Sequence, residues 1–510
     1  MNKMPPPGSG FIDRFVTKTS LYPDQIAIEE PENFIRITYA QLLSSIQQMK
    51  SILNELGVGK GKKILVLLTR PKDFITSLYA ISAGSGIMVP VSPHLTKYEM
   101  ESIVDDCHPD GIILTSSLFH FHETVFKKEK KIQFVITIDK KIDVEPLKNI
   151  FFDDFKGKKS PVKDPLENPE VTCHYTFRGF GYPLGTIHRY HDYTWNQNGI
   201  EKRNPYEQGD SFLSFLPLYH IYAIVIIIIF PLCQGCKIIF IHKMLRLDFI
   251  EIFKKFHIRL ACFIPVFIPK LIRDAKANGK PENFNLHPGF SLSSSASYLD
   301  PHTIKELTDA VGVEINQAYG STETLAVSSA YKKKERGTLG LPFDHTTIRV
   351  VDFRGSDVPQ GQIGEIITWG PATAERYLNC QEANARHFKN GFFYTGDLGY
   401  FDSNGFLNFI GRKLPIAKIK DQMVDLIEID NILSSHPSVI RAVTVLKKGD
   451  KTIKKTLFTH LIVDNPEITP GQIKRFCANS LSRYKIPLRF NITNYNQALI
   501  KKENYYHGVN

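Results

Sequence analysis

Two short runs in the second half of the chain contain residue types that suit phosphate and metal chemistry. The first is Tyr-Gly-Ser-Thr-Glu at 319–323, and the second, at 394–402, contains Thr-Gly-Asp with Asp397 as its acid. Carboxylates are the ligands that hard cations such as Mg²⁺ prefer, and they accept hydrogen bonds from paired hydroxyl groups. Arg412 follows and offers a planar fork of donors to anionic oxygens. Each run alone is weak, because the first also suits a turn that starts a helix and the second suits an ordinary loop.

The segments before these runs alternate between helix and strand patterns. A capping box at Thr38 and Gln41 opens an amphipathic pattern that ends at Gly57. Short continuous apolar runs, typical of buried parallel strands, lie at 63–68, 87–91, 112–114 and 134–137. This alternation predicts an α/β architecture with a parallel sheet covered on both faces.

The pattern changes after about residue 335. Short β runs appear there, and Asn404-Gly405 between two apolar runs predicts a hairpin. Beyond Arg412 the sequence predicts a helix at 427–435, strands at 439–446 and 457–463, and a last helix at 470–482. These elements form a small α+β unit of roughly a hundred residues. We therefore predict two domains, 1–410 and 411–510.

Composition is that of a globular protein. The 510 residues are too many for one hydrophobic core, and 42% are apolar and 23% charged. The net charge of +11 comes mostly from scattered lysines, which indicates a solvated surface rather than a nucleic-acid partner. Attraction to anionic small molecules or to a membrane surface is left open by the charge.

The cysteines and the apolar segments indicate a cytoplasmic protein. Seven cysteines, an odd number, do not resemble a disulfide framework. Cys233 and Cys236 form a CxxC without a second pair or nearby histidines, which favours buried packing over zinc binding. The N-terminus lacks the apolar segment of a secretory signal, and the apolar run at 221–230 is too short to span a bilayer. We expect no transmembrane segment; a peripheral membrane contact is left open.

In order and spacing, the two runs and Gly411-Arg412-Lys413 resemble the superfamily of acyl-CoA synthetases, luciferases and peptide-synthetase adenylation domains. Further segments are similar to that family's motifs: Phe-Leu-Pro-Leu-Tyr-His at 215–220, Tyr-Pro-Asp at 22–24, His-Pro-Ser-Val at 436–439 and Tyr-Lys-Ile-Pro at 484–487. The resemblance extends from about residue 11 to residue 502. It implies a large N-terminal α/β domain with parallel sheets and a β subdomain, followed by a small mobile α+β lid domain.

The resemblance also implies an activity. Family members use ATP and Mg²⁺ to convert a carboxylic acid into an acyl-AMP, and most then transfer the acyl group to a thiol, that of CoA or of a carrier-protein phosphopantetheine arm. The implied catalytic residues are Thr322, Glu323, His220 and Lys502, with Glu323 as the Mg²⁺ ligand. The implied nucleotide-binding residues are Thr176, Arg178, Gly181, Gly185, Ser295, Ala296, Tyr319, Gly320, Thr322, Asp397 and Arg412.

Each implied role has a competing structural interpretation. Asp397 is also suited to forming a turn, and Glu323 to the first turn of a helix, where the dipole favours a carboxylate. His220 also suits a core histidine. Lys502 also suits an exposed surface position, and Lys501 is the alternative to it. The agreement of several motifs favours the functional interpretation for Glu323, Asp397 and Arg412.

The phosphate-binding loop departs from the family pattern, which is roughly YTSGTTGxPKG. Backbone N–H groups and hydroxyls of that loop cradle the β- and γ-phosphates, and its lysine supplies charge. In this chain the stretch is 175–185, where Phe177, Gly179 and Phe180 replace the hydroxyl cluster and Leu184 replaces the lysine. We expect Arg178 to supply the charge from its displaced position.

The C-terminal part departs as well. Asp421 stands where the family has a lid glycine, and the hinge falls near Leu414, with Pro415 beside it. The family's terminal Gly-Lys is represented by Lys501-Lys502 without the glycine. These changes predict that acyl-AMP formation outruns transfer to CoA.

Two functions are consistent with these patterns. The first is an ATP-dependent acid–thiol ligase for a carboxylic acid, with a fatty acid favoured over an aromatic one. The second is a catalytically impaired homologue that binds an acyl group, a nucleotide or a partner protein. The pocket for the acid is expected around 215–222 and 293–297, with Tyr298 among its aromatic residues.

Overall fold

The computed structural model describes residues 8–203, 206–242, 247–263, 267–294, 299, 301–331, 333–413, 416–419, 422–448, 455–465 and 467–494. The chain divides into two compact units. Unit 1 contains Met1–Pro93, Cys107–His174 and Gly185–Gly411. Unit 2 contains His94–Asp106, Tyr175–Leu184 and Arg412–Asn510. The two-domain division at 410 and 411 stays a prediction; the loop expected to bind phosphate belongs to unit 2.

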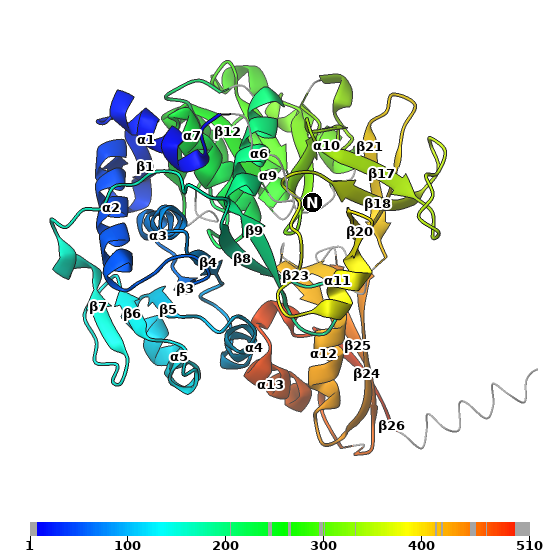
Figure 1. Ribbon diagram of the computed structural model, residues 1–510. Coiled ribbons are helices and arrows are strands. Elements are labelled where there is room, and N and C mark those ends of the chain that lie inside the picture. Colours follow the sequence, from blue (N-terminus) through cyan, green and yellow to red (C-terminus); the bar gives the residue numbers. More distant parts are fainter. Residues whose placement is uncertain are drawn as a thin grey trace, which may run out of the picture. The chain divides into compact units, whose positions relative to one another are not determined.

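The first sheet has seven strands in the order β7-β6-β5-β3-β4-β8-β9. These are β3 (Lys63–Leu67), β4 (Ile87–Pro90), β5 (Gly111–Leu114), β6 (Phe134–Thr137), β7 (Lys148–Phe151), β8 (Glu170–Thr176) and β9 (Leu184–Arg189). The pairs β3–β4, β3–β5, β5–β6 and β6–β7 are parallel, which confirms the prediction from their apolar runs. Figure 1 shows α2 (Tyr39–Glu55) and α3 (Pro71–Ala83) on one face of these strands and α5 (Ser116–Lys128) on the other.

The predicted capping box at the start of α2 is confirmed. Thr38 Oγ1 accepts a hydrogen bond from the Gln41 N–H at 3.2 Å, and Gln41 Oε1 accepts one from the Thr38 N–H at 2.9 Å. Two backbone donors that the helix cannot satisfy are thereby bonded. The capping box thus fixes where α2 begins, and the helix buries its apolar face.

The second sheet has nine strands in the order β16-β15-β14-β13-β12-β10-β11-β1-β2. These are β1 (Ile26–Glu30), β2 (Ile35–Thr38), β10 (Ser211–Ser214), β11 (Lys237–Phe240), β12 (Ile258–Phe263), β13 (Ser291–Ser294), β14 (Ile315–Ser321), β15 (Leu325–Ser329) and β16 (Leu341–Pro342). Its centre is parallel, whereas β14–β15 and β15–β16 are antiparallel. The parallel strands end at one edge of the sheet, and the β14–β15 hairpin carries the first motif run there.

Unit 1 contains further helices. They are α1 (Phe11–Leu21), α6 (Tyr190–Arg203), α7 (Phe230–Gln234), α8 (Phe249–Phe256), α9 (Ile268–Ala277), α10 (Pro301–Val311) and α11 (Gln381–His387), with short 3₁₀ turns at Pro31–Asn33, Phe152–Phe155, Pro281–Asn283 and Lys333–Glu335. The apolar run at 221–230 forms a buried π-helical segment, η3 (Ala223–Ile229), that continues into α7. In the described part of the chain, none of the helices combines the length and apolar character needed to cross a membrane. Cys233 and Cys236 are buried, as predicted.

A smaller sheet of five strands belongs to unit 1 as far as Gly411. It contains β17 (Thr347–Val351), β18 (Gly364–Trp369), β19 (Phe388–Lys389), β20 (Phe392–Phe401) and β21 (Leu407–Arg412). The predicted hairpin joins β20 to β21, and Gly405 takes the left-handed conformation with φ 78°. Asp402 Oδ1 accepts from the N–H groups of Asn404 and Phe406 at 2.9 and 3.0 Å and so stabilises this turn.

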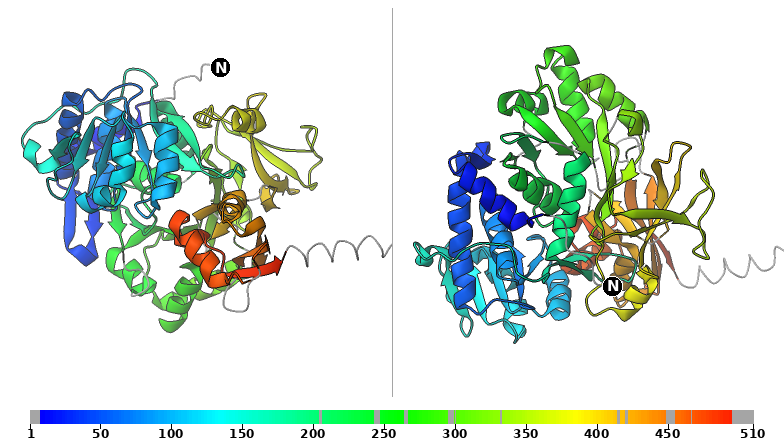
Figure 2. Two further views of the ribbon diagram at one scale, coloured as in Figure 1. Left: turned by 90° about the horizontal axis from the view of Figure 1, so that it is seen from below. Right: turned by 45° about the horizontal axis from the view of Figure 1, so that its top comes forward.

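Unit 2 has a core of its own. Its strands are β22 (Ile416–Ile419), β23 (Gln422–Asp425), β24 (Val439–Lys448), β25 (Lys455–Val463) and β26 (Arg489–Asn494). The sheet β24-β25-β26 contacts α12 (Leu426–Ser434) and α13 (Pro470–Ser480), both visible in Figure 2. Val424, Ile429 and Leu461 are among the buried residues between them. The predicted helices and strands of this segment are confirmed to within a few residues.

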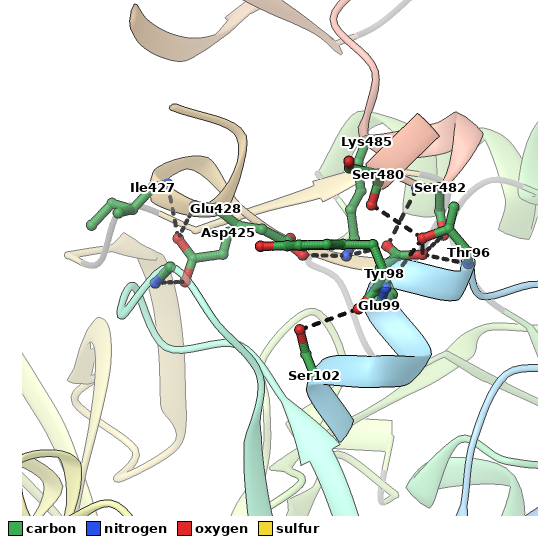
Figure 3. A network of polar contacts seen from close by, with 11 residues as sticks. Thr96, Tyr98, Glu99, Ser102, Asp425, Ile427, Glu428, Ser480, Ser482 and Lys485 are labelled. Atoms are coloured by element: carbon green, nitrogen blue, oxygen red, sulfur yellow. Dashed lines mark hydrogen bonds and ion pairs between the residues drawn. The ribbon is translucent and has the colours of Figure 1, made fainter. Parts of the chain in front are cut away.

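A buried cation joins three segments of unit 2 (Figure 3). Lys485, in the short turn η8 (Arg483–Lys485), is 1% exposed, and its Nζ lies 2.7 Å from Glu99 Oε1 and 2.9 Å from Glu428 Oε1. Glu99 lies on α4 (Lys97–Cys107) and also accepts from the Thr96 N–H at 2.9 Å, as in a capping box. Lys485 therefore links α4 to α12 through an ion pair with each helix.

The two carboxylates beside Lys485 differ in their proton affinity. Burial raises the pKa of Glu428 to about 7, against the lowering effect of Lys485, and the charges of Glu99 and Asp425 raise it further. Burial opposes ionisation of Glu99 too, but Lys485 and the hydrogen bond from Ser482 hold the pKa of Glu99 below its ordinary value. One lysine cannot neutralise all these carboxylates, so Glu428 keeps its proton to higher pH.

We expect Glu428→Gln to gain stability relative to the wild type as pH rises from about 4.5 to about 7. The pKa of Glu428 is about 7 in the fold and 4.5 ordinarily, so over this interval the folded protein holds a proton that the unfolded chain has lost. Wild-type stability therefore falls with rising pH, whereas glutamine stays neutral; the expected gain is on the order of 1–3 kcal/mol. Thermal unfolding followed by circular dichroism between pH 5 and pH 8 measures it.

Glu99→Gln is the matched control. Because the pKa of Glu99 is lowered, its carboxylate stabilises the fold above the ordinary value, and that contribution is lost as pH falls. The stability of Glu99→Gln relative to the wild type should therefore fall only as pH rises toward about 4.5, and it should stay nearly constant between pH 5 and pH 8, where Glu428→Gln gains stability. Parallel curves for wild type and Glu428→Gln would contradict the assignment.

Candidate functional site

The run 319–323 forms the end of β14 and the turn into β15. Residues 322–324 are the turn, and the Ser321 N–H donates to Thr324 Oγ1 at 3.0 Å. A Cβ on Gly320 would lie 1.9 Å from the Leu325 carbonyl oxygen, so this position requires glycine. Glu323 therefore lies in a tight hairpin turn, and the alternative of a helix first turn is wrong.

Glu323 is completely buried. Its Oε1 accepts a hydrogen bond from the Tyr377 hydroxyl at 2.7 Å, and its carbonyl accepts one from the Ala374 N–H at 2.7 Å. The Leu378 N–H in turn donates to the Gly185 carbonyl at 2.7 Å. The segment 374–378 thus connects the turn to β9. A buried carboxylate needs such donors, because ionisation without them is strongly unfavourable.

A second buried side chain holds the same turn. His188, at the end of β9, has its Nε2 2.7 Å from the Thr322 carbonyl oxygen and its Nδ1 3.3 Å from Asp192 Oδ2. A carbonyl oxygen accepts and does not donate, so Nε2 carries a proton. Asp192 Oδ2 also accepts from the Arg189 N–H at 3.0 Å, at the start of α6. His188 therefore fixes Thr322 relative to α6.

The two predicted runs meet at Tyr319 and Asp397. The Tyr319 hydroxyl donates to Asp397 Oδ2 at 2.9 Å, across 78 positions of sequence, and both residues are buried. Asp397 lies in β20 beside Gly396, which has φ 71°, where the pairing with β18 is irregular. The Asp397 N–H donates to Thr395 Oγ1 at 3.0 Å. The irregular pairing and these bonds aim the carboxylate at Tyr319.

His220 is half-buried and belongs to a small group of histidines. Its Nδ1 accepts from the Tyr222 N–H at 3.2 Å, which shapes the turn before η3. His174 lies deeper. Burial, and then the neighbouring His188 and His220, hold the pKa of His174 well below its usual range. His174 is therefore neutral near pH 7, and its Nε2 lies 3.1 Å from the Tyr193 hydroxyl.

Four predicted nucleotide-binding residues lie in unit 2. Thr176 and Arg178 are buried, and the Gly181 N–H donates to Asp425 Oδ2 at 3.1 Å. Arg412 is exposed, with its Nη1 3.3 Å from Met423 Sδ. Leu184, which replaces the family lysine, is 1% exposed. That position thus packs inside the protein here.

The predicted site residues are therefore distributed over two units. Unit 1 brings together Tyr319 with Asp397, and Thr322 with Glu323. Several other predicted positions lie outside the described residues: Ser295, Ala296, Tyr298, Leu414, Pro415, Asp421, Lys501 and Lys502. The sequence did not indicate the residues that hold the turn and the loop, namely Tyr377, His188, Asp192 and Asp425. No spacing relates them to the motifs, and tertiary contacts alone identify them.

The metal ligands available at the turn suit a Mg²⁺ ion that is held mainly by phosphates and water. Among the described residues no group of three or more histidine, cysteine or acidic side chains converges on one point. Mg²⁺ is commonly held by one or two carboxylates together with substrate phosphates and water. A single buried glutamate, with one oxygen fixed by Tyr377, suits that arrangement.

Comparison with known proteins agrees with this architecture. The 2-succinylbenzoate–CoA ligase of Bacillus cereus (strain ATCC 10987 / NRS 248) is 24% identical over 475 residues, covering 92% of this chain and 91% of that protein. The indoleacetate–CoA ligase of Aromatoleum aromaticum is 24% identical over 488 residues, covering 94% and 92%. A double mutant of o-succinylbenzoate CoA synthetase from Bacillus subtilis, solved with a product analogue, shares the fold with a TM-score of 0.80 at 20% identity, covering 95% of each chain.

The family model described as AMP-binding enzyme matches residues 15–378. This match includes the loop 175–185, the turn at 322–324 and the segment that carries Tyr377, and it confirms the resemblance that the motifs indicated. The chain belongs to the AMP-binding enzyme family.

Proposed function

We propose that this protein is an AMP-forming acid–thiol ligase. It activates a carboxylic acid with ATP to an acyl-AMP and passes the acyl group to the thiol of CoA, with a carrier-protein phosphopantetheine arm as the alternative acceptor. The observation that supports this most directly is the Tyr319–Asp397 hydrogen bond of 2.9 Å, which joins the two motif runs. Relatives of similar length that are named CoA ligases add support. We also propose a cytoplasmic location.

The geometry suggests how the site residues act in this proposal. Asp397, oriented by Tyr319, accepts hydrogen bonds from the ribose hydroxyls, and the Tyr319 ring borders the adenine. Glu323 holds Mg²⁺ together with the phosphates, while Thr322 donates to the α-phosphate. Bound Mg²⁺ would neutralise phosphate charge that develops during the displacement. Tyr377 keeps the Glu323 carboxylate in one orientation without neutralising it.

The remaining site residues keep the roles that the family pattern implies. His220 lies near the acid, Arg412 near ribose and phosphate, and Lys502 stabilises adenylation. Arg178 supplies the charge that Leu184 no longer provides; a guanidinium stays charged at any working pH even where it is buried, as Arg178 is. Magnesium and these roles form part of the proposal.

We propose an apolar acid as substrate. A fatty acid remains the first candidate, because the segment after His220 is aliphatic throughout η3. An aromatic acid is the second candidate, supported by two observations. Phe215 packs edge-on against Phe263 and Phe267, with ring centroids 4.9 and 5.3 Å apart. In addition, the named acids of the relatives are 2-succinylbenzoate and indoleacetate.

Pyrophosphate release with ATP and Mg²⁺ over a panel of acids tests the proposal. The panel should contain decanoate and palmitate beside indoleacetate and 2-succinylbenzoate, each with and without CoA. Acid-dependent release followed by a CoA thioester supports the ligase. If no acid stimulates release while AMP still binds, the impaired nucleotide-binding homologue is the better description.

We expect Glu323→Gln to lower acid-dependent pyrophosphate release at least about 100-fold, because the neutral amide is a poor Mg²⁺ ligand. Glutamine keeps an oxygen that accepts from Tyr377, so the thermal unfolding temperature should stay close to that of the wild type. The matched control is Glu314→Gln, which removes an equal charge from the partly exposed pair with Arg336 in the same unit. Near-normal release by Glu323→Gln at limiting Mg²⁺ would rule out the metal role.

His188 is expected to act on catalysis by positioning Thr322. Leucine at position 188 cannot donate to the Thr322 carbonyl, so His188→Leu should lower kcat for pyrophosphate release about tenfold or more. Glutamine places an amide N–H close to the position of Nε2, so His188→Gln should restore most of the rate. AMP affinity should be similar in all three proteins. Equal rates for the leucine and glutamine variants would show that the bond does not matter.

A further inference from the structure

The phosphate-binding loop of this protein already holds an anionic group. The N–H groups of Gly179 and Gly181 both donate to Asp425 Oδ2, at 2.9 and 3.1 Å. Both glycines take the left-handed conformation, with φ 79° and 80°, and this conformation turns their N–H groups toward one acceptor. In the family these are loop amides of the kind that cradle the β- and γ-phosphates. A carboxylate oxygen therefore lies where the loop chemistry suits a phosphate oxygen.

The second oxygen of the same carboxylate caps a helix. Asp425 Oδ1 accepts from the N–H groups of Ile427 and Glu428, at 2.9 and 3.4 Å, at the start of α12. One side chain thus binds four backbone donors, two from the loop and two from the helix. Aspartate does both because it has two equivalent oxygens and is long enough to reach the loop from the N-cap position.

The loop is closely packed against this helix. A Cβ on Gly181 would lie 2.6 Å from Asn431 Nδ2 and 3.1 Å from Ile427 Cγ2, so α12 approaches the loop as near as a glycine permits. Lys485 Nζ lies 4.5 Å from the centroid of the Phe177 ring, so the buried lysine also contacts the loop. These contacts and the Asp425 bonds seat the loop on one surface of unit 2.

The charged groups around Asp425 make it unfavourable for a second anion to bind the loop amides while the Asp425 carboxylate is bound there. Burial raises the pKa of Asp425, although the four backbone N–H groups act to lower it. Glu428 and Glu99 are further carboxylates of the same neighbourhood, and Lys485 and Arg178 are its buried cations. A second, more highly charged anion at the Gly179 and Gly181 amides would repel the Asp425 carboxylate, so both cannot bind there together.

We propose that the Asp425 carboxylate is an internal competitor for the triphosphate, and that the β- and γ-phosphates of ATP must displace it from the loop amides. This inference rests on the proposed function, because it concerns the same nucleotide site. AMP carries no β- or γ-phosphate, so its binding does not require the displacement. The protein then discriminates against polyphosphates in its resting state and binds them when α12 releases the loop.

Two variants separate loop release from loss of the helix cap. Serine is a good N-cap residue but is too short to reach the loop, so Asp425→Ser should keep α12 and free the amides. Asparagine also caps a helix, and its NH₂ group presents a donor where the loop needs an acceptor, so Asp425→Asn should act in the same way. Asp430→Asn is the control: it removes an equal charge from the same helix, and Asp430 accepts from the Thr444 N–H at 2.7 Å instead of from the loop.

The first measurement is amide hydrogen exchange of the peptide 175–184 in the ligand-free proteins. The second is the affinity for pyrophosphate, ATP and AMP by calorimetry. We expect faster exchange of the loop in Asp425→Ser and Asp425→Asn than in the wild type. Both variants should bind pyrophosphate and ATP about tenfold more tightly, with AMP affinity changed less than about twofold. Asp430→Asn should match the wild type in both measurements.

Any of three results would overturn the inference. Unchanged exchange in both Asp425 variants would mean that the carboxylate does not hold the loop. Faster exchange without a gain in pyrophosphate affinity would mean that it holds the loop but does not compete for phosphate. An equal gain in pyrophosphate affinity for Asp430→Asn would show that the effect comes from the lost charge alone, and this result would also contradict the inference. If no acid stimulates pyrophosphate release in any variant, the ligase proposal fails. Hydrogen exchange and pyrophosphate affinity would still test whether Asp425 competes for the loop amides.

Discussion

Carboxylates that lie inside this protein are held by hydrogen-bond donors, and this requirement shapes both units. Unpaired ionised carboxylates are strongly unfavourable in an interior, so each one needs donors brought from other segments. Glu323 receives the hydroxyl of Tyr377, and Asp397 receives that of Tyr319. Asp425 receives backbone N–H groups from a loop and a helix. In the folded protein, the strands and turns that carry these donors are therefore required for the acids to be buried.

The two kinds of donor have different chemical consequences. A tyrosine hydroxyl fixes the orientation of a carboxylate and leaves its charge available to a cation or to sugar hydroxyls, which suits Glu323 and Asp397. Backbone N–H groups in a glycine loop bind carboxylate and phosphate oxygens alike. The loop amides are therefore bonded to the Asp425 carboxylate, which resembles the phosphate expected there. The hydrogen bonds that allow the Asp425 carboxylate to be buried are therefore the ones for which we propose that phosphate competes.

Much of the fold could be predicted because it depends on local patterns. The apolar runs at 63–68 and 87–91 become buried parallel strands, since strands covered on both faces have no polar side. The capping box at Thr38 and the turn at Gly405 form as predicted, because both depend on residues within a few positions of each other. The spacing of motif runs, compared with the family pattern, predicted that the chain adopts this α/β fold.

The candidate site could be predicted only in part. The runs at 319–323 and 394–402 are recognisable in the sequence, and their meeting at Tyr319 and Asp397 follows from the family order. Tyr377 could not be found, because a tyrosine has no signature until the acid that it bonds lies beside it. The helix alternative for Glu323 failed because propensity did not register that Gly320 passes so close to the Leu325 carbonyl.

The sequence by itself determined the residue types, the order of helices and strands, and the substitution of Leu184 for a lysine. These are properties of single positions and of short-range periodicity. Tertiary structure decided which donor bonds which acceptor: His188 bonds the Thr322 carbonyl, and the Asp425 carboxylate accepts from the amides of Gly179 and Gly181. Such pairs join residues more than a hundred positions apart. Their geometry exists only when packing has brought the segments together, so no local pattern can encode it.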